Sequence, residues 1–301
     1  MSLPPASPTK LAILATLAGH PEGLEAMSMI LSSQPAPVTT ATPLRLSVVI
    51  LAYNDLKAVI LCLKSLVATA GAAGMAGRLE ILVQDDASPD VDLTTILGPP
   101  AQVARNKVNL GFAANCNMGA QRADRASDIL FFLNQDTQAQ SDWFEPLVRM
   151  FDDPRVGIVG PKLIFADDKK ESVQSCGGLY DGGKGPFHRY LGYAADDWRV
   201  NIAEKVSWTT GAALAIRQTL FWAVNGFDPA YGRGYFEDVD LCEKVKARGY
   251  EVWYCPEAVF KHEVGTSSAA TQESFRENSI RFHNKWNYRI VPDTPIVHVN
   301  Y

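Results

Sequence analysis

Three acidic residues that follow an aromatic loop are the strongest candidates for chemistry in this chain. Glu237, Asp238 and Asp240 come after a segment rich in glycine, tyrosine and phenylalanine, and they precede a run that predicts a helix ending near Gly249. The macrodipole of a helix favours acidic residues in its first turn, which would be a purely structural explanation. Aromatic surroundings, however, raise the pKa of a carboxyl group toward the range of a general base. Both explanations are open at this point.

Three apolar runs that predict buried strands each end in polar residues. The runs lie within residues 46–54, 79–90 and 127–137 and alternate with helical patterns, which predicts a mostly parallel α/β sheet. Ligands of such sheets bind beyond the carboxyl ends of the strands. We therefore expect one site at this edge, although turns also favour Asp and Asn. The polar residues at the three ends are Tyr53 and Asn54, then Asp85 and Asp86, and then Asn134, Gln135 and Asp136.

The chemistry of these strand ends suits a nucleotide with a divalent cation. Asp136 is the natural ligand for magnesium or manganese, which bind carboxylates together with substrate phosphates. Asp85 and Asp86 could accept hydrogen bonds from a base or a ribose, and the Tyr53 ring could stack on the base. His262 follows a predicted strand and could be a further metal ligand. The structural alternatives are a strand-end turn for Asp136, a helix cap for the paired aspartates and a structural role for His262.

The composition argues against several other classes of protein. The net charge of −5 and the pI of about 5.6 argue against a partner that is nucleic acid. No apolar run approaches the roughly 20 residues of a membrane-spanning helix. The five cysteines are scattered and form no CxxC pair, which is typical of a reducing compartment and predicts a cytoplasmic location. A P-loop, a strand-linked GxGxxG and a GxSxG elbow are all missing from the sequence.

The chain is expected to have three parts. Residues 1–45 hold one predicted helix and a linker rich in proline, serine and threonine, residues 46–267 form the main domain, and residues 268–301 form a helical extension. The extension interleaves aromatic and basic residues. It could pack on the domain, form the surface of a homodimer, or contact a membrane peripherally at its inner face.

Six segments, taken in order, resemble the inverting family-2 glycosyltransferases with the GT-A fold. The combination of GGLYD, a glycine-rich stretch and EDVDL is most similar to a bacterial rhamnosyltransferase-like subgroup that builds cell-surface polysaccharide. The resemblance implies a Rossmann-like, mostly parallel central sheet flanked by helices, with added helices at both ends of the chain. The matching segments are residues 48–54, 83–90, 109–119, 132–137, 209–250 and 260–267.

The resemblance implies a nucleotide-binding role for the strand-end residues. Tyr53, Asp85 and Asp86 would hold the nucleoside, and Asn115 would lie next to the donor. Asn134 stands where the family usually has the first acid of a DxD motif. Because an amide oxygen is a weaker cation ligand than a carboxylate, Asn134 would either reduce the metal affinity or contact the ribose instead.

The resemblance also implies the metal site and the catalytic base. Asp136 and His262 would bind Mg²⁺ or Mn²⁺ at the donor diphosphate. Asp238 matches the base that removes the proton of the acceptor hydroxyl group. Glu237 and Asp240 are close enough in sequence to be mistaken for it, although helical geometry places Asp238 and Asp240 on different faces.

Asp240 and two further residues, Trp208 and His188, are candidates for the acceptor side or a lid. Trp208 could stack on a sugar ring, with a core tryptophan as the alternative. His188 lies in the glycine-rich and aromatic segment 176–200, which could be a mobile lid over the donor or a structural loop.

The function implied is transfer of a sugar, with inversion, from a nucleotide-sugar donor to an acceptor. The donor would be UDP-linked or dTDP-linked, with rhamnose suggested by similarity, and the acceptor would be a glycan or a lipid-linked molecule. One alternative is a nucleotidyltransferase, but the basic glycine-rich triphosphate loop that it needs is missing near residue 46. The other is a catalytically inactive module that binds a sugar nucleotide or a glycan, which Asn134 makes conceivable and an intact Asp238 argues against.

Overall fold

The computed structural model describes residues 43–70, 77–140, 142–181, 185–263, 272–286 and 290–293 of the chain. The helix and linker expected in residues 1–45 therefore lie almost entirely outside the described residues. The strands are β1 Leu46–Ala52, β2 Leu79–Asp85, β3 Ala101–Arg105, β4 Ile129–Asn134, β5 Thr137–Ala139, β6 Val156–Phe165, β7 Val173–Ser175, β8 Gly178–Asp181, β9 Gly185–His188, β10 Glu204–Val206, β11 Ala213–Arg217 and β12 Glu251–His262. The α-helices are α3 Leu56–Thr69, α5 Phe112–Ala120, α6 Phe144–Arg149, α7 Gln218–Ala223, α8 Glu237–Lys246 and α9 Gln272–Trp286.

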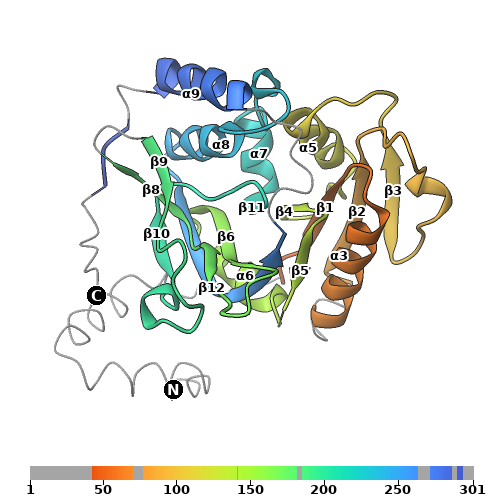
Figure 1. Cartoon of the computed structure of the whole chain (residues 1–301), viewed down its shortest axis with the longest axis horizontal. Coiled ribbons are helices and arrows are strands. Elements are labelled where there is room, and N and C mark those ends of the chain that lie inside the picture. Colours follow the sequence, from red (N-terminus) through yellow and green to blue (C-terminus); the bar gives the residue numbers. More distant parts are fainter. Residues whose placement is uncertain are drawn as a thin grey trace.

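The described strands form one large mixed sheet and a separate β8–β9 pair (Figure 1). Along the large sheet the order is β10-β12-β6-β11-β4-β1-β2-β3, with β5 paired to β12 and β7 to β6. The pairings make β1 to β4, β6 and β12 run in one direction, whereas β11 and β10 run against them. The sequence-based prediction of a mostly parallel central sheet is confirmed, and the antiparallel β11 is an addition to it.

The register of the central strands brings the three polar ends together. In the parallel pairing of β1 with β2, Ala52 lies opposite Asp85, and in the pairing of β1 with β4, Leu51 lies opposite Asn134. Residues that follow these positions therefore emerge at the same edge of the sheet. The alternating strands and helices were sufficient to predict this arrangement.

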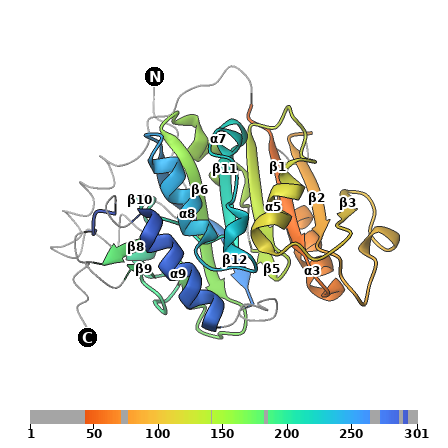
Figure 2. The same cartoon turned by 90° about the horizontal axis from the view of Figure 1, so that it is seen from above.

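Helices cover both faces of the sheet, which explains why β1 is apolar along its whole length. All seven residues of β1 are buried. Val49 and Leu51 belong to the cluster that packs under α5, α7 and α8, and Val48 and Ile50 belong to the cluster under α3 and α6. Figure 2 shows α5, α7, α8 and α9 together on one side of the sheet.

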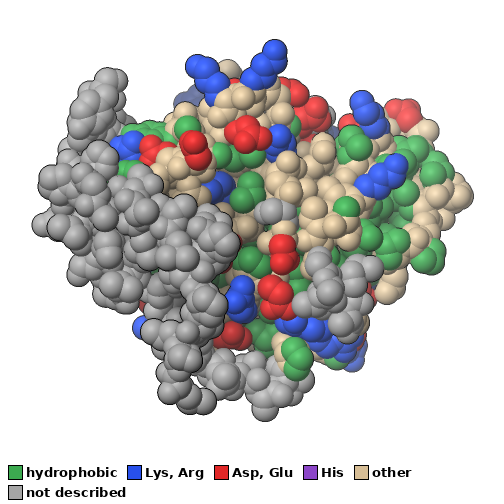
Figure 3. Space-filling view, turned by 90° about the horizontal axis from the view of Figure 1, so that it is seen from below, with side chains coloured by type: hydrophobic (Ala, Val, Ile, Leu, Met, Phe, Trp, Pro, Cys, Tyr) green, Lys and Arg blue, Asp and Glu red, His purple; other side chains and the backbone are tan. Residues whose placement is uncertain are grey.

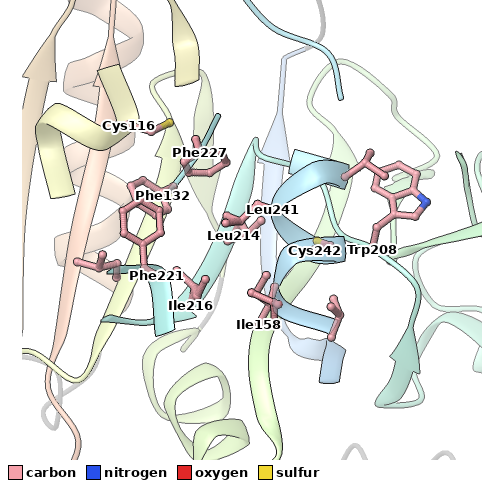
Figure 4. Close-up of a cluster of buried hydrophobic side chains, with 14 of the residues drawn as sticks. Cys116, Phe132, Ile158, Trp208, Leu214, Ile216, Phe221, Phe227, Leu241 and Cys242 are labelled. Carbon is pink, nitrogen blue, oxygen red and sulfur yellow. The ribbon is translucent and has the colours of Figure 1, made fainter. Parts of the chain in front are cut away.

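Aromatic rings fill the cluster under α5, α7 and α8. Phe132 of β4 lies with its ring centroid 5.1 Å from that of Phe221 and 5.1 Å from that of Phe227 (Figure 4). Edge-to-face and tilted contacts of this kind add to the free energy gained by burial. The cluster thereby ties β4 to the chain around α7.

The helix expected in residues 268–301 is present as α9 and packs beside α8 (Figures 1 and 2). Phe282 and Trp286 of α9 are buried in the same cluster as the α8 residues. The Trp286 Nε1–H donates to the buried carboxylate of Asp240 at 2.8 Å, and Lys285 Nζ lies 2.8 Å from the same oxygen. These contacts show that α9 packs on the domain, which is one of the three roles considered for the extension.

The surface carries both basic and acidic side chains. Figure 3 shows Lys and Arg side chains next to Asp and Glu side chains on the described part of the face opposite α9. Among the described residues, no helix is both long and apolar enough to cross a membrane.

Truncation of Phe132 tests the core between β4 and α7. Because the side chain is fully buried, Phe132→Ala should lower the free energy of unfolding by about 3–5 kcal/mol. Phe275→Ala, at a residue that is 51% exposed, should lower it by less than about 1 kcal/mol. Urea unfolding followed by circular dichroism measures both, and equal losses would contradict this description of the core.

Candidate active site

A cavity opens at the carboxyl ends of β1 and β4, where the sequence predicts a site. Its wall combines the ends of these strands, the loop before α5 and the loop before α8. Of the predicted site residues, the cavity wall contains four. The lining residues are Leu51, Ala52, Tyr53, Asp86, Asn109, Gly111, Phe112, Asn115, Asn134, Gln135 and Arg233.

Gln135 fixes the end of β1 and was not predicted to have a role of its own. Its Oε1 accepts a hydrogen bond from the Tyr53 backbone N–H at 2.8 Å, and its Nε2 donates to the Tyr53 carbonyl oxygen at 2.9 Å. The Tyr53 ring stays 38% exposed at the cavity. The amide thus holds the Tyr53 backbone on both sides while leaving the ring available for stacking. The only signal in the sequence was its place between Asn134 and Asp136.

Asp86 organises the loop that leads into α5. Its Oδ1 accepts hydrogen bonds from Asn106 Nδ2 and the Leu110 N–H, both at 2.8 Å, and its Oδ2 accepts one from the Gly111 N–H at 3.0 Å. Asn106 also donates to Asn115 Oδ1 at 2.8 Å. Asn106, which the sequence did not single out, therefore joins two predicted nucleotide-binding residues into one buried network.

Asp85 is engaged inside the protein and does not line the cavity. It is fully buried, its Oδ1 accepts from the N–H and the hydroxyl of Ser88, and its Oδ2 lies 3.0 Å from Arg105 Nη1. These bonds stabilise the turn after β2, which was the structural alternative for the paired aspartates. A contact of Asp85 with the nucleoside stays a prediction.

Asp136 and His262 face each other beside the cavity. His262 ends β12, where it pairs with Thr137 of β5, and its Nε2 lies 3.2 Å from Asp136 Oδ1. His262 Nδ1 lies 2.7 Å from Oε1 of Gln174 in β7. An Nδ1–H that donates to Gln174 leaves the Nε2 lone pair directed at Asp136, so one oxygen and one nitrogen converge on the same point. Gln174 had no recognisable signal in the sequence.

The Asp136–His262 pair fits a cation that is bound partly by substrate. A carboxylate and an imidazole are ligands that manganese accepts, and magnesium is commonly held by one or two carboxylates plus phosphate oxygens. Among the described residues, no group of three or more His, Cys, Asp or Glu side chains is placed to hold a metal ion. A cation here would need further ligands from a bound diphosphate or from water.

Asp238 is linked to the cavity through the turn before β11. Its Oδ2 accepts a hydrogen bond from the Gly211 N–H at 2.9 Å, and the next residue, Ala212, accepts one from the Asn134 N–H at 2.9 Å. A Cβ on Gly211 would lie 3.2 Å from the ring of Phe112, which lines the cavity. Burial raises the pKa of the Asp238 carboxyl group, as a general base requires.

The neighbours of Asp238 have different surroundings. Glu237 is buried, and burial followed by the charge of Asp238 raises its pKa well above the ordinary value. Asp240 is fully buried between α8 and α9, where its Oδ1 accepts hydrogen bonds from Trp286 and Tyr231. Asp238 and Asp240 thus point to different partners, as helical geometry predicts, and the described bonds of Asp240 join two helices.

The buried Trp208 and the half-buried His188 form a separate pair. The Trp208 side chain is 5% exposed, its Nε1–H donates to the Leu179 carbonyl oxygen at 3.2 Å, and its ring lies 4.8 Å from that of His188. Burial lowers the pKa of His188 to about 4. Neither residue lines the cavity, and segment 176–200 contains the β8–β9 pair. Their roles toward an acceptor or in a lid stay predictions.

Several residues of the site have a left-handed backbone. Asn54 (φ 56°) and Ala87 (φ 62°) follow β1 and β2, and Tyr235 and Phe236 (both φ 72°) immediately precede Glu237. Such φ values are uncommon for residues other than glycine and cost free energy. They occur at the two strand ends and at the start of α8, where the candidate functional residues lie.

The model of one protein family, glycosyl transferase family 2, matches residues 47–198, about half of the chain. The chain belongs to glycosyl transferase family 2. The membership predicted from the six segments is confirmed, and the rhamnosyltransferase-like resemblance is supported by homologues of that activity.

The chain is similar to two curated relatives over part of their length. The uncharacterized protein y4gI of Sinorhizobium fredii is 28% identical over 71% of this chain and 24% of its own length. The N-acetylglucosaminyl-diphospho-decaprenol L-rhamnosyltransferase of Mycobacterium tuberculosis is 29% identical over 46% of this chain and 47% of its own length. The chain thus spans a quarter to a half of these relatives.

A crystal structure of GalNAc-T7 with UDP, GalNAc and Mn²⁺ has the same fold. It superposes with a TM-score of 0.66 at 18% identity, over 81% of this chain and 49% of the other. The predicted GT-A fold is confirmed by this likeness and by the sheet order.

Replacement of Glu237 tests its unusual environment. Because burial raises its pKa, the folded chain keeps a proton that the unfolded chain has already lost above about pH 4.5. Stability must therefore fall as the pH rises from that value toward the raised pKa. Glu237→Gln should lose less unfolding free energy than the wild type between about pH 5 and about pH 8.

The matched control is Glu277→Gln, at an exposed position of α9. Urea unfolding at the two pH values measures the difference. The described environment of Glu237 would be wrong if Glu237→Gln showed the same pH dependence as the wild type and the control.

Proposed function

We propose that this protein is an inverting glycosyltransferase that takes a sugar from a UDP-linked or dTDP-linked donor. The observation that carries the proposal is the cavity at the carboxyl edge of the sheet, with the Asp136–His262 pair beside it and the Asp238 carboxylate joined to the same edge through the Gly211 N–H. Family membership supplies the class of reaction. The relative that transfers L-rhamnose supports rhamnose as the sugar and a lipid-linked or glycan acceptor. Such a reaction would serve the synthesis of cell-surface polysaccharide.

The donor would lie in the cavity with its nucleoside against Tyr53 and its diphosphate toward Asp136. The Tyr53 ring is exposed on a backbone held by Gln135, so it can stack on a base without reorganisation. Asn134 and Asn115 add amide groups to the same wall. Asp136 and His262 would hold Mg²⁺ or Mn²⁺, which when bound neutralises negative charge on the leaving diphosphate.

Asp238 would act on the acceptor. Its carboxylate would take the proton of the acceptor hydroxyl group as that oxygen forms a bond to the anomeric carbon and the bond to the diphosphate oxygen breaks. A single displacement of this kind inverts the anomeric centre. The Gly211 N–H fixes one carboxylate oxygen, and this hydrogen bond orients the base before the acceptor arrives.

The donor site is tested by calorimetric binding of UDP and dTDP, each with Mn²⁺ and with EDTA. Binding of at least one nucleotide is expected, and its affinity should rise with Mn²⁺ because the cation links the diphosphate to Asp136. The nucleotide that binds more tightly identifies the donor class. If neither nucleotide bound under either condition, the proposed function would be wrong and a glycan-binding module would be the better explanation.

The base is tested with Asp238→Asn, which keeps the shape of the side chain but cannot accept the proton. The turnover number of sugar transfer should fall by roughly a hundredfold or more, while the dissociation constant of the donor nucleotide should change by less than about twofold. Asp167→Asn, at an exposed residue, is the matched control and should keep normal turnover. Near-normal turnover in Asp238→Asn would remove Asp238 from this role.

A further inference from the structure

We propose that Arg233 binds the diphosphate of the donor and allows nucleotide binding without a divalent cation. The inference rests on the proposed function, because it assumes that the cavity holds a nucleoside diphosphate. Arg233 had no assigned role in the sequence-based prediction. It lies in the loop before α8 and lines the cavity together with residues of the strand ends.

The charges of the cavity wall leave Arg233 available to an anion. Among the described lining residues, Arg233 is the only basic residue and Asp86 is the only acidic one. Both oxygens of Asp86 already accept N–H groups of the loop before α5. A guanidinium group presents a planar set of donors that matches two phosphate oxygens, and such charge-assisted bonds are stronger than neutral ones.

The backbone around Arg233 is adapted to approach the cavity closely. Gly232 (φ 64°) and Gly234 (φ 142°) flank it in conformations that residues with a Cβ rarely adopt. A Cβ on Gly111, at the start of α5, would lie only 2.7 Å from the Gly232 carbonyl oxygen. The loop therefore packs directly on the backbone at the start of α5, which also lines the cavity.

A buried residue of α9 holds this loop on both sides of Arg233. Asn278 Nδ2 donates hydrogen bonds to the carbonyl oxygens of Tyr231 and Gly234, both at 2.8 Å. Asn278 is 5% exposed, so losing either bond would leave a buried polar group unsatisfied. The side chain of Arg233 is exposed on a fixed backbone, which lowers the entropic cost of binding a ligand there.

Arg233 matters for diphosphate binding because Asn134 stands where the family usually has the first acid of the DxD motif. Beside the cavity, the candidate metal ligands are one carboxylate, Asp136, and one imidazole, His262, where a second carboxylate would add another charge. An amide at position 134 carries no charge and attracts a cation less. Arg233 supplies a permanent positive charge from the cavity wall, so that part of the diphosphate charge is neutralised without metal.

The experiment is calorimetric binding of UDP, dTDP, uridine and thymidine to the full chain in EDTA. The wild type is expected to bind the preferred nucleoside diphosphate without metal. Arg233→Gln should weaken that binding by about tenfold or more, and should leave the affinity for the nucleoside, which has no phosphate, nearly unchanged. Arg248→Gln, at an exposed arginine at the end of α8, is the matched control and should behave as the wild type.

Two further variants sharpen the test. Asn278→Ala should weaken diphosphate binding in the same direction as Arg233→Gln, because the loop loses both hydrogen bonds, while thermal unfolding confirms that the chain is folded. Asn134→Asp restores a second acid and should increase the ratio of the affinities measured with Mn²⁺ and with EDTA.

The outcomes separate this inference from the proposed function. Equal affinity of Arg233→Gln and the wild type for the nucleoside diphosphate in EDTA would overturn the role of Arg233 and leave the donor site intact. Binding by the wild type that strictly requires Mn²⁺ would overturn it as well. No binding of either diphosphate with or without Mn²⁺ would overturn the proposed function together with the inference.

Discussion

The in-register parallel pairing of β1 with β2 and β4 is the constraint on which the rest of the site depends. Because β1 is buried on both faces and paired on both edges, its register is fixed by packing on two sides at once. A slip of one residue would exchange the residues that face α3 with those that face α5. The same register determines that Tyr53, Asp86 and Gln135 emerge at one edge. Helix α8, which carries Asp238, is joined to this edge through the hydrogen bond from the Gly211 N–H.

The Asp and Glu side chains around the cavity and α8 have different roles because their surroundings differ. Asp85 and Asp86 are saturated with N–H and hydroxyl donors and stabilise loops. Asp240 is buried against an indole N–H and an ammonium group and joins two helices. Burial raises the pKa of both Glu237 and Asp238, although Asp238 accepts hydrogen bonds from the Gly211 and Val239 N–H groups. The environment, more than the residue type, therefore separates loop-forming acids from a candidate base.

The sequence was sufficient to predict the elements that have a clear hydrophobic pattern or a recognisable residue at one end. The run at residues 46–54 predicts a strand buried on both faces, and β1 is buried along its whole length. The contacts of Gln135 with Tyr53, of Gln174 with His262 and of Asn278 with Tyr231 could not be predicted, because each joins positions 47 to 88 residues apart. His262, which was predicted to follow a strand, instead ends β12, because the strand continues past a register shift between Cys255 and Val259. A side-chain amide can pair with any backbone or ring, so its partner is determined by the completed fold.

The buried Asp240 has a consequence for the order in which the chain can mature during synthesis. Tyr231 and Lys244 contact its carboxylate from the loop before α8 and from α8, and α9 adds Trp286 and Lys285. Losing some of its partners destabilises a buried charge. The loop that carries Arg233 likewise receives two hydrogen bonds from Asn278 of α9. A nascent chain that has emerged from the ribosome only as far as β12 lacks the α9 contacts that stabilise α8 and its preceding loop. We therefore expect the region around Asp238 to reach its full stability only after α9 has been synthesised.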